Sequence, residues 1–172
     1  MTAIEIRPIR DTDLDAYKTL RLEALRLYPE AFSSDYQAQK EMPESFWQNR
    51  IHSATQSSDQ VLYVAEHAGQ LIGSAGCVRE DSPKARHNGL IVGVYVQDAY
   101  RGQALGQKLI QACLDWAVAH EVTIAKLGVG AYNQSAIRCY QAMGFEHWGT
   151  EPRALLVNGH YIDEWQMAKV LV

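Results

Sequence analysis

LIVGVYV at residues 90–96 and RGQALG at residues 101–106 are the two adjoining segments that decide the fold of this chain. The apolar run predicts a strand, the glycine segment a turn, and the amphipathic residues up to His120 a helix. A helix that begins at a glycine turn leaves several backbone N–H groups unpaired, and its dipole favours negative charge there. We therefore interpret the strand, loop and helix as a phosphate or pyrophosphate site, to which Arg101 can add a charge-assisted hydrogen bond.

Two common nucleotide-binding loops do not match these residues. A Walker loop ends in Gly-Lys-Ser or Gly-Lys-Thr, whereas Gly106 is followed by Gln107 and Lys108. A dinucleotide-binding loop needs three glycines spaced Gly-x-Gly-x-x-Gly and an acidic residue about 20 positions later. Only Gly102 and Gly106 occur here, which disfavours binding of ATP or NAD. A nucleotide-binding protein remains the least favoured interpretation of this segment.

A second segment, residues 128–145, has the boundary residues of a helix that follows an apolar strand. Asn133 is a favourable N-cap, because its side-chain oxygen can accept a hydrogen bond from a free backbone N–H. Gly144 followed by Phe145 suits a left-handed C-terminal turn with an apolar contact. We therefore predict a helix from Asn133 to Gly144.

Together the two segments resemble the motifs of the GCN5-related N-acetyltransferases, the GNAT superfamily. The first family motif is Arg/Gln-x-x-Gly-x-Gly/Ala after a bulged strand; Arg101, Leu105 and Gly106 fit it, and Ala104 stands where glycine is usual. A methyl group at Ala104 restricts positive φ and limits how closely the backbone can approach a phosphate, so we expect it to affect CoA affinity. Five residues match the later motif in order and spacing: Asn133, Ala136, Tyr140, Gly144 and Phe145.

The resemblance implies an α/β (α+β) protein with the GNAT fold, in which a mixed sheet of about seven strands is splayed between strands four and five and accompanied by about four helices. It implies acetyl-CoA as the cosubstrate, lying between the splayed strands, and no metal. We treat residues 1–172 as one GNAT N-acetyltransferase domain. The residues implied to bind acetyl-CoA are Val94, Tyr95, Val96, Arg101, Gly102, Gln103, Ala104, Leu105, Gly106, Asn133, Ala136 and Tyr140.

The implied reaction is direct attack of a primary amine on acetyl-CoA in a ternary complex. A backbone N–H of the strand near residues 94–96 can polarise the thioester carbonyl. The resemblance makes Tyr140 the general acid, because in the family this tyrosine faces the thioester sulfur and a phenol is a plausible proton donor to a thiolate. From the residues alone, core packing is the ordinary explanation of such a tyrosine, and the neighbouring Cys139 is interpreted as a buried thiol.

The general base and the acceptor stay open at this stage. In the family, acceptor specificity comes largely from the first two helices, their connection and the last loop, here residues 28–36 and 152–161. The acceptor can be a polyamine, an amino acid, an aminoglycoside or a protein N-terminus. Candidates for the base, besides a chain of waters, are Glu80, Asp81, His87, His160, Asp163 and Glu164. Candidates for an apolar acceptor slot are Phe32, Tyr36 and Trp47, with Glu30 and Asp35 to attract an ammonium group.

Composition fits a small globular enzyme, since 47% of the 172 residues are hydrophobic and 21% are charged. A net charge of −4 argues against nucleic acid as the main partner and is compatible with a cationic amine. The three cysteines lack zinc or redox spacing, which predicts reduced thiols and a cytoplasmic location. No apolar run is long enough to span a membrane, and the N-terminal residues lack an apolar signal core.

The main alternative to an enzyme is a catalytically idle acyl-CoA-binding sensor or regulatory module. Asn133 and Tyr140 favour the enzyme, because a sensor has no need for the proton donor. The resemblance also makes a homodimer through the closing strands possible. The predicted strands are 4–9, 61–66, 71–78, 90–96, 122–127, 145–150 and 160–171, and the predicted helices start near residues 11, 43, 103 and 133.

Overall fold

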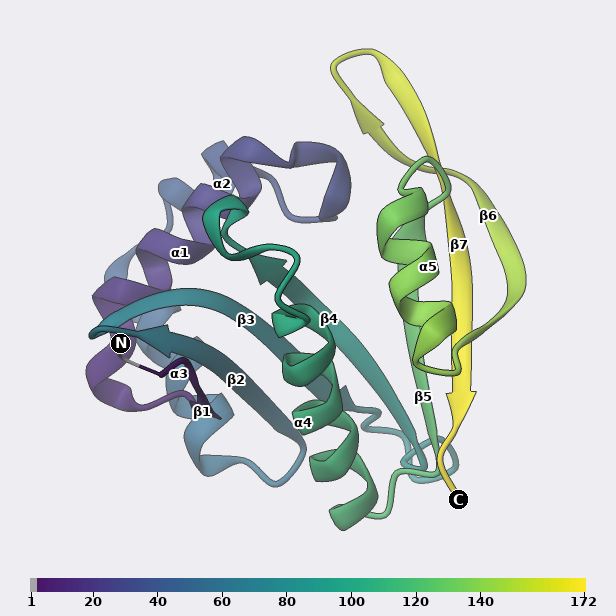
Figure 1. Cartoon of the computed structure of the whole chain (residues 1–172), viewed down its shortest axis with the longest axis horizontal. Coiled ribbons are helices and arrows are strands. Elements are labelled where there is room, and N and C mark those ends of the chain that lie inside the picture. Colours follow the sequence, from purple (N-terminus) through teal and green to yellow (C-terminus); the bar gives the residue numbers. More distant parts are fainter. Residues whose placement is uncertain (1–2) are drawn as a thin grey trace.

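The computed structural model describes residues 3–172 and contains a mixed sheet of seven strands in the order β1-β2-β3-β4-β5-β7-β6 (Figure 1). This confirms the expected fold class. The strands are β1 (Glu5–Pro8), β2 (Gln60–His67), β3 (Gln70–Arg79), β4 (Asn88–Val96), β5 (Ile124–Gly130), β6 (Glu146–Val157) and β7 (His160–Val170). The helices are α1 (Leu14–Leu27), α2 (Tyr36–Lys40), α3 (Glu44–Gln56), α4 (Leu105–Ala119) and α5 (Gln134–Ala142), with 3-10 turns η1 (Asp11–Asp13), η2 (Pro29–Ala31) and η3 (Asp98–Tyr100).

Strands β4 and β5 run parallel but pair only at one end. Their register couples residues 88–90 of β4 with residues 124–126 of β5, and the pairing stops at Leu90. Beyond this point the strands separate, and Figure 1 shows the V between teal β4 and green β5. Within the described chain, the facing backbone edges of the two strands therefore have no sheet partner along the open part of the V.

A β-bulge in β4 lies within the diverging part of the strand. Two residues of β4, Gly93 and Val94, lie opposite one residue of β3, Ala75. Gly93 has a φ of +62°, a left-handed conformation that glycine adopts without the strain a Cβ would add. Because a bulge bends its strand and increases its twist, β4 curves away from β5 here.

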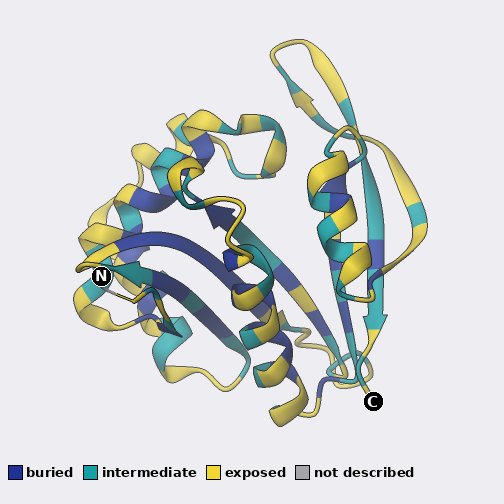
Figure 2. Ribbon diagram, viewed as in Figure 1, coloured by how far each residue is buried: buried dark blue, intermediate teal, exposed yellow. Residues whose placement is uncertain are grey.

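Helices on the two faces of the sheet divide the core into two clusters (Figure 2). The helices α4 and α5 pack on one face, where Leu109 and Ile137 join Leu127 of β5. The helices α1 and α3 pack on the other face, where Leu20 and Trp47 belong to a separate cluster. We call these the α4/α5 face and the α1/α3 face.

Local sequence accounts for the main elements. Buried apolar residues recur along α4 with helical spacing, which fixes the face that packs on the sheet. The turn between β2 and β3 is Ala68-Gly69, with φ values of 50° and 80°, as a two-residue hairpin turn requires. Asn133 caps α5, since its side-chain oxygen accepts a hydrogen bond from the Ala136 N–H at 3.1 Å. The predicted cap is confirmed, and so are the two predicted strands, residues 61–66 and 71–78, that this turn joins.

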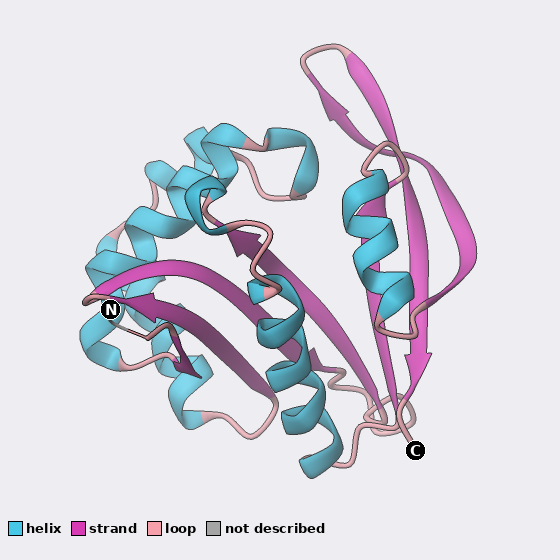
Figure 3. Cartoon of the chain, viewed as in Figure 1, coloured by secondary structure: helices cyan, strands magenta, loops and turns pink. Residues whose placement is uncertain are grey.

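Two segments differ from the predicted secondary structure, and Figure 3 shows the helices and strands of the chain. None of the predicted helices starts within residues 28–42, but Asp35 accepts a hydrogen bond from the Ala38 N–H at 2.8 Å and caps the short helix α2 there. The strand expected to end at residue 150 continues as β6 to Val157. Pro152 is tolerated there because β6 is an edge strand whose register shifts between Glu151 and Leu155.

Candidate active site

The backbone of β4 lines one wall of the V. Val94, Tyr95 and Val96 all lie beyond Leu90, the last residue that pairs with β5. The Tyr95 side chain is buried on the α1/α3 face, where its hydroxyl donates a hydrogen bond to Glu23 at 2.7 Å. The predicted cofactor residues of this strand therefore offer the V mainly their backbone groups.

The glycine loop leads into an uncapped helix. Gly102 and Ala104 have φ values of 79° and 58°, and α4 then begins at Leu105 without a side-chain cap. The first N–H groups of α4 find no acceptor within residues 3–172. A Cβ added at Gly106 would meet no atom within 4 Å, so open space adjoins the first turn. The loop and helix thus have the free donors predicted for a phosphate site.

Arg101 is engaged within its own loop. Its guanidinium lies 3.1 Å from the Asp98 carboxylate, and its Nε donates to the Val96 carbonyl at 3.2 Å. The group also stacks over the Tyr28 ring at 4.6 Å. In this arrangement Arg101 holds the loop in place and does not project toward the open space beside Gly106.

On α5, Asn133 and Ala136 form the N-terminal cap, and Tyr140 lies near the C-terminal end. The Tyr140 ring packs edge-to-face on Phe145, with the ring centroids 6.1 Å apart. Burial raises the pKa of the Tyr140 phenol above its ordinary value, so the hydroxyl is protonated at neutral pH. The structure shows no hydrogen-bond partner for this hydroxyl within residues 3–172, which leaves the proton available to a ligand.

The acidic and histidine residues proposed as bases fall at different ends of the V. Glu80, Asp81 and His87 lie in the loop before β4, at the end where β4 and β5 are paired. His87 is six residues from the bulge at Gly93, a distance of about 20 Å along a strand. His160 adjoins the β6–β7 turn. These four residues are not brought to the bulge.

Glu164 of β7 lies beside the open part of β5. It pairs with Gly130, and its Oε2 lies 3.0 Å from the position of a Cβ on Gly128. Burial, and then the Glu151 carboxylate, raise the pKa of Glu164 above its ordinary value of 4.5. The pKa of the Tyr132 phenol is raised by burial, then by Glu30 and then by Glu164. Tyr132, Glu30 and Glu164 therefore belong to one site. The carboxylate of raised pKa therefore lies over the face of β5, in the part of the strand that is not paired with β4.

Sheet alternation places Glu164 on the α1/α3 face. Leu127 and Val129 of β5 are buried in the cluster under α4 and α5, so the intervening Gly128 and Gly130 point to the opposite face. Glu164 pairs with Gly130 and shares its face. Tyr140 packs with the α4/α5 cluster, and the two candidate proton-transfer groups therefore lie on opposite sides of the sheet.

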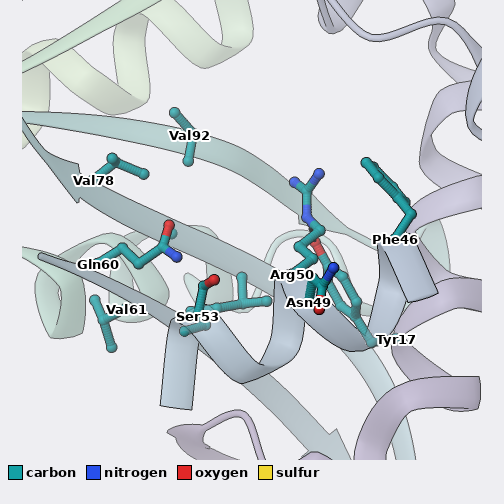
Figure 4. Close-up of a pocket in the computed structure, with 12 residues that line it drawn as sticks. Tyr17, Phe46, Asn49, Arg50, Ser53, Gln60, Val61, Val78 and Val92 are labelled. Carbon is teal, nitrogen blue, oxygen red and sulfur yellow. Dashed lines mark hydrogen bonds between the residues drawn. The ribbon is translucent and has the colours of Figure 1, made fainter. Parts of the chain in front are cut away.

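A pocket of about 420 Å³ lies on the α1/α3 face, between α3 and strands β2–β4 (Figure 4). It reaches Val92, the residue before the bulge glycine. Arg50 extends from α3 into this region, and its Nε donates to the Tyr17 hydroxyl at 3.1 Å. The residues labelled in the figure are Tyr17, Phe46, Asn49, Arg50, Ser53, Gln60, Val61, Val78 and Val92.

The predicted acceptor slot is partly wrong. Trp47 cannot line a slot, because it is completely buried and packs edge-to-face against Tyr17. Tyr36 lies under the Lys40 ammonium, and Asp35 is used as the cap of α2. Phe32 stacks on the guanidinium of Arg21 at 5.0 Å, and Glu30 lies near Tyr132 and raises the pKa of its phenol.

Arg21 is not among the site residues predicted from the sequence. It is a buried cation on α1, with 8% of its surface exposed, and its Nη1 lies 3.8 Å from the position of a Cβ on Gly93. The available signal was its position, because Arg21 falls between Tyr17 and Leu25 on the apolar face of a predicted amphipathic helix. A charged residue on such a face is a candidate for function.

Comparison with known proteins identifies the family. The profile of the acetyltransferase (GNAT) family matches residues 20–145. The chain belongs to this family, which confirms the resemblance carried by the two motifs and the prediction of an acetyltransferase. Between residues 3 and 172 no group of three or more His, Cys, Asp or Glu side chains is placed to hold a metal ion, and no helix is long and apolar enough to cross a bilayer.

Individual relatives are distant. The L-amino acid N-acetyltransferase AaaT of Escherichia coli is 25% identical over 174 residues, covering 99% of this chain and 99% of AaaT. N-acetyltransferase 8 of Rattus norvegicus is 31% identical over 89 residues, which are 51% of this chain and 40% of that protein, so the match spans less than half of that relative. The structure of yncA from Salmonella typhimurium with its cofactor acetyl-CoA has a TM-score of 0.86 at 22% identity, covers 99% of this chain and 95% of that chain, and shows the same fold.

The left-handed conformation of Ala104 leads to a prediction about stability. A non-glycine residue in this conformation is strained by about 1–2 kcal/mol. Glycine relieves the strain but gives up about 0.5–1 kcal/mol of conformational entropy, so Ala104→Gly is expected to raise the free energy of unfolding by up to about 1 kcal/mol. Urea unfolding measures this change.

The matched control for Ala104→Gly is Ala112→Gly in the middle of α4, where the same replacement should destabilise the protein by about 1 kcal/mol. Equal destabilisation by both variants would contradict the argument from the left-handed conformation.

Proposed function

We propose that this protein transfers the acetyl group of acetyl-CoA to a primary amine by direct attack in a ternary complex. The observation that carries the proposal is the V between β4 and β5, with unpaired strand edges inside it and the uncapped N-terminus of α4 beside it. Two exposed strand edges give amide-containing ligands a place to pair, and the helix N-terminus gives phosphate groups free N–H donors. Acetyl-CoA combines both kinds of group.

The residues of the V and the loop fit acetyl-CoA in the proposed arrangement. The backbone of Val94 and Val96 pairs with the pantetheine arm, and a backbone N–H of this strand polarises the thioester carbonyl. The backbone N–H groups of residues 102–106, which include Gln103, bind the pyrophosphate beside the open space at Gly106. Bound acetyl-CoA supplies the activated acetyl group.

Tyr140 is proposed as the general acid. When the amine expels the CoA thiolate, the leaving sulfur needs a proton, and a protonated phenol with a free hydroxyl can supply it. Burial raises the pKa of Tyr140, so the phenol carries its proton at neutral pH when the thiolate leaves. The hydroxyl has no competing partner within residues 3–172.

Glu164 is proposed as the general base. An unperturbed amine with a pKa of about 10.4 is almost fully protonated at neutral pH, and it must lose a proton before attack. A carboxylate whose pKa is raised by burial is a better proton acceptor than an ordinary one. Because Glu164 lies on the α1/α3 face and Tyr140 packs on the other, the amine is proposed to enter from the α1/α3 face.

The acceptor class is narrowed by one relative. AaaT carries the name of an L-amino acid N-acetyltransferase, and its alignment spans almost all of both chains. We therefore place free amino acids first among the acceptors, ahead of peptide and protein amines. A cytoplasmic location and a homodimer stay predictions from the sequence.

The experiment that tests the proposed function is release of CoA thiol from acetyl-CoA across a panel of amino acids, amines, aminoglycosides and peptides. Acceptor-dependent release that falls by about 10- to 1,000-fold in kcat in Tyr140→Phe, at nearly unchanged acetyl-CoA affinity, is the expected result. A reaction without acceptor corrects for the protein's own thiols. Acetyl-CoA binding without release for any acceptor would favour the idle acyl-CoA sensor, and full activity in Tyr140→Phe would remove the acid role.

Gly106→Ala is expected to separate stability from cofactor binding. In the free protein the added methyl group meets no atom within 4 Å, and alanine is favoured over glycine in a helix by about 0.5–1 kcal/mol. The variant should therefore unfold at higher urea concentration but bind CoA at least about tenfold more weakly, a loss of about 1.4 kcal/mol. Calorimetric titration with CoA measures the affinity, and unchanged affinity would contradict the proposed phosphate site.

Glu164→Gln is expected to lower kcat/KM by about 100-fold near neutral pH, because the variant lacks the proposed base. The decrease of kcat/KM toward acidic pH should also be lost in this variant. The same variant should be more stable than the parent at pH 8. The raised pKa means that the folded state holds the proton more tightly than the unfolded chain, so ionised Glu164 destabilises the fold above its folded pKa. The advantage should disappear below the ordinary carboxyl pKa of 4.5, where both states are protonated.

The control for Glu164→Gln is Glu151→Gln, which removes the carboxylate that helps to raise the pKa of Glu164. It should keep activity and move the acidic limb of kcat/KM to lower pH. An unchanged limb in both variants would show that Glu164 is not the base.

A further inference from the structure

Arg21 is a buried cation that has no carboxylate partner. Only 8% of its surface is exposed, and none of the ion pairs within residues 3–172 includes it. Its Nη2 donates to the Ser34 hydroxyl at 3.2 Å, while its Nε is sealed from solvent without any partner. The protein therefore leaves a full positive charge in its interior without a negative charge to compensate it.

The surroundings of Arg21 increase this imbalance. Burial lowers the pKa of the guanidinium, and although Tyr17 raises it, the nearby cation Arg50 lowers it again. The ring of Phe32 stacks on the group at 5.0 Å and offers a weak cation–π contact, which stabilises the charge less than a carboxylate does. A buried charge is costly unless it is paired and hydrogen-bonded, so this arrangement is complete only with an anion present.

Arg21 faces the bulge of β4, three residues beyond the last residue that pairs with β5. Its Nη1 lies 3.8 Å from the position of a Cβ on Gly93, the bulge glycine. This nitrogen has no hydrogen-bond partner within residues 3–172, and it is not among the atoms sealed from solvent. The lack of a side chain at Gly93 leaves room beside the guanidinium. The free donor therefore points to the stretch of β4 that borders the V, on the α1/α3 face.

The pocket on the same face has a second cation and mainly apolar walls, with Asn49, Ser53 and Gln60 among its polar lining residues. Arg50 lines it, and so do Phe46, Val78 and Val92. Val92 precedes Gly93 in β4, and Tyr17 precedes Arg21 by one turn of α1, so the pocket adjoins the Arg21 site. At about 420 Å³ it has room for an apolar side chain of amino-acid size.

We propose that Arg21 binds the carboxylate of the acceptor, and that the acceptor is therefore a free α-amino acid with an apolar side chain. This inference rests on the proposed acetyl transfer and identifies the residue that selects the substrate. The carboxylate pairs with the Nη1 edge of Arg21, the α-amine points into the V toward the thioester, and the side chain enters the pocket bounded by Phe46, Val78 and Val92. Arg50 adds positive charge near the carboxylate.

Charge separates this acceptor from the alternatives. A polyamine or an aminoglycoside would add positive charge beside Arg21 and Arg50 and leave both unpaired. A peptide or protein N-terminus has a neutral amide in place of the α-carboxylate, so it compensates neither cation. The carboxylate of a free amino acid supplies the negative charge that compensates Arg21.

The experiment compares three amino acids with analogues that keep the side chain but lack the carboxylate. L-Leucine, L-methionine and L-phenylalanine are each assayed against their amides and their decarboxylated amines, with acetyl-CoA saturating. We expect the acids to exceed the amides and amines by about 10- to 100-fold in kcat/KM, the effect of one charge-assisted hydrogen-bonding contact. Equal rates for the acid and its amide in the parent protein would overturn the inference without any variant.

Arg21→Gln tests the residue itself. It should lower kcat/KM for the acids by about 10- to 100-fold, mainly through KM, and leave the amides and the KM of acetyl-CoA unchanged. Arg26→Gln, an exposed arginine on the same helix, is the matched control and should change nothing. An equal loss for the acids and the amides would assign Arg21 a structural role and contradict the inference.

Two further measurements keep the inference testable if the variant folds poorly or turnover is absent. Because Arg21 is unpaired, Arg21→Met should be at least as stable as the parent in urea, whereas marked destabilisation would indicate that the charge is needed for folding. Calorimetric titration of the CoA-bound protein with the three amino acids reports binding without chemistry. Binding by the parent that is lost in Arg21→Met would support the site even if acetyl transfer fails, and no binding of any of the three would overturn it.

Discussion

The incomplete pairing of β4 with β5 is the constraint on which the rest of the structure depends. Two parallel strands that stay paired would satisfy each other's backbone groups and leave no room between them. Here the pairing stops at Leu90, and the bulge at Gly93 turns β4 away while β3 keeps it in the sheet. The unpaired edges need partners, and a ligand with amide groups along an extended arm supplies them. The loop that starts α4 stands beside the same opening.

The two faces of the sheet divide the proposed chemistry. Tyr140 belongs to the α4/α5 cluster and is the proposed proton donor to the leaving thiolate. Glu164 and Arg21 lie on the α1/α3 face, where Glu164 is proposed to accept a proton from the amine and Arg21 to pair with the carboxylate of the acceptor. In this proposal, acetyl-CoA lies between the two groups of residues.

The sequence predicted the elements with local signals and missed those that depend on distant contacts. The cap at Asn133, the two-residue turn after β2 and the strand, loop and helix up to α4 all follow from neighbouring residues. The end of β6 could not be predicted from neighbouring residues. Pro152 is tolerated only at a sheet edge, and the edge position is a property of the whole sheet. The same distinction applies to the site. Motif spacing pointed to Tyr140, but pairing across strands places Glu164, and contact between α1 and the bulge places Arg21.

The most direct test of the central claim is a crystal structure of the protein with CoA. We expect the pantetheine arm between β4 and β5, hydrogen-bonded to the backbone of residues 94–96, and the pyrophosphate on the N–H groups of residues 102–106. The CoA sulfur should lie between Tyr140 on one face and the bulge at Gly93 on the other. CoA bound elsewhere, or β4 and β5 paired along their whole length with no room for it, would contradict the account.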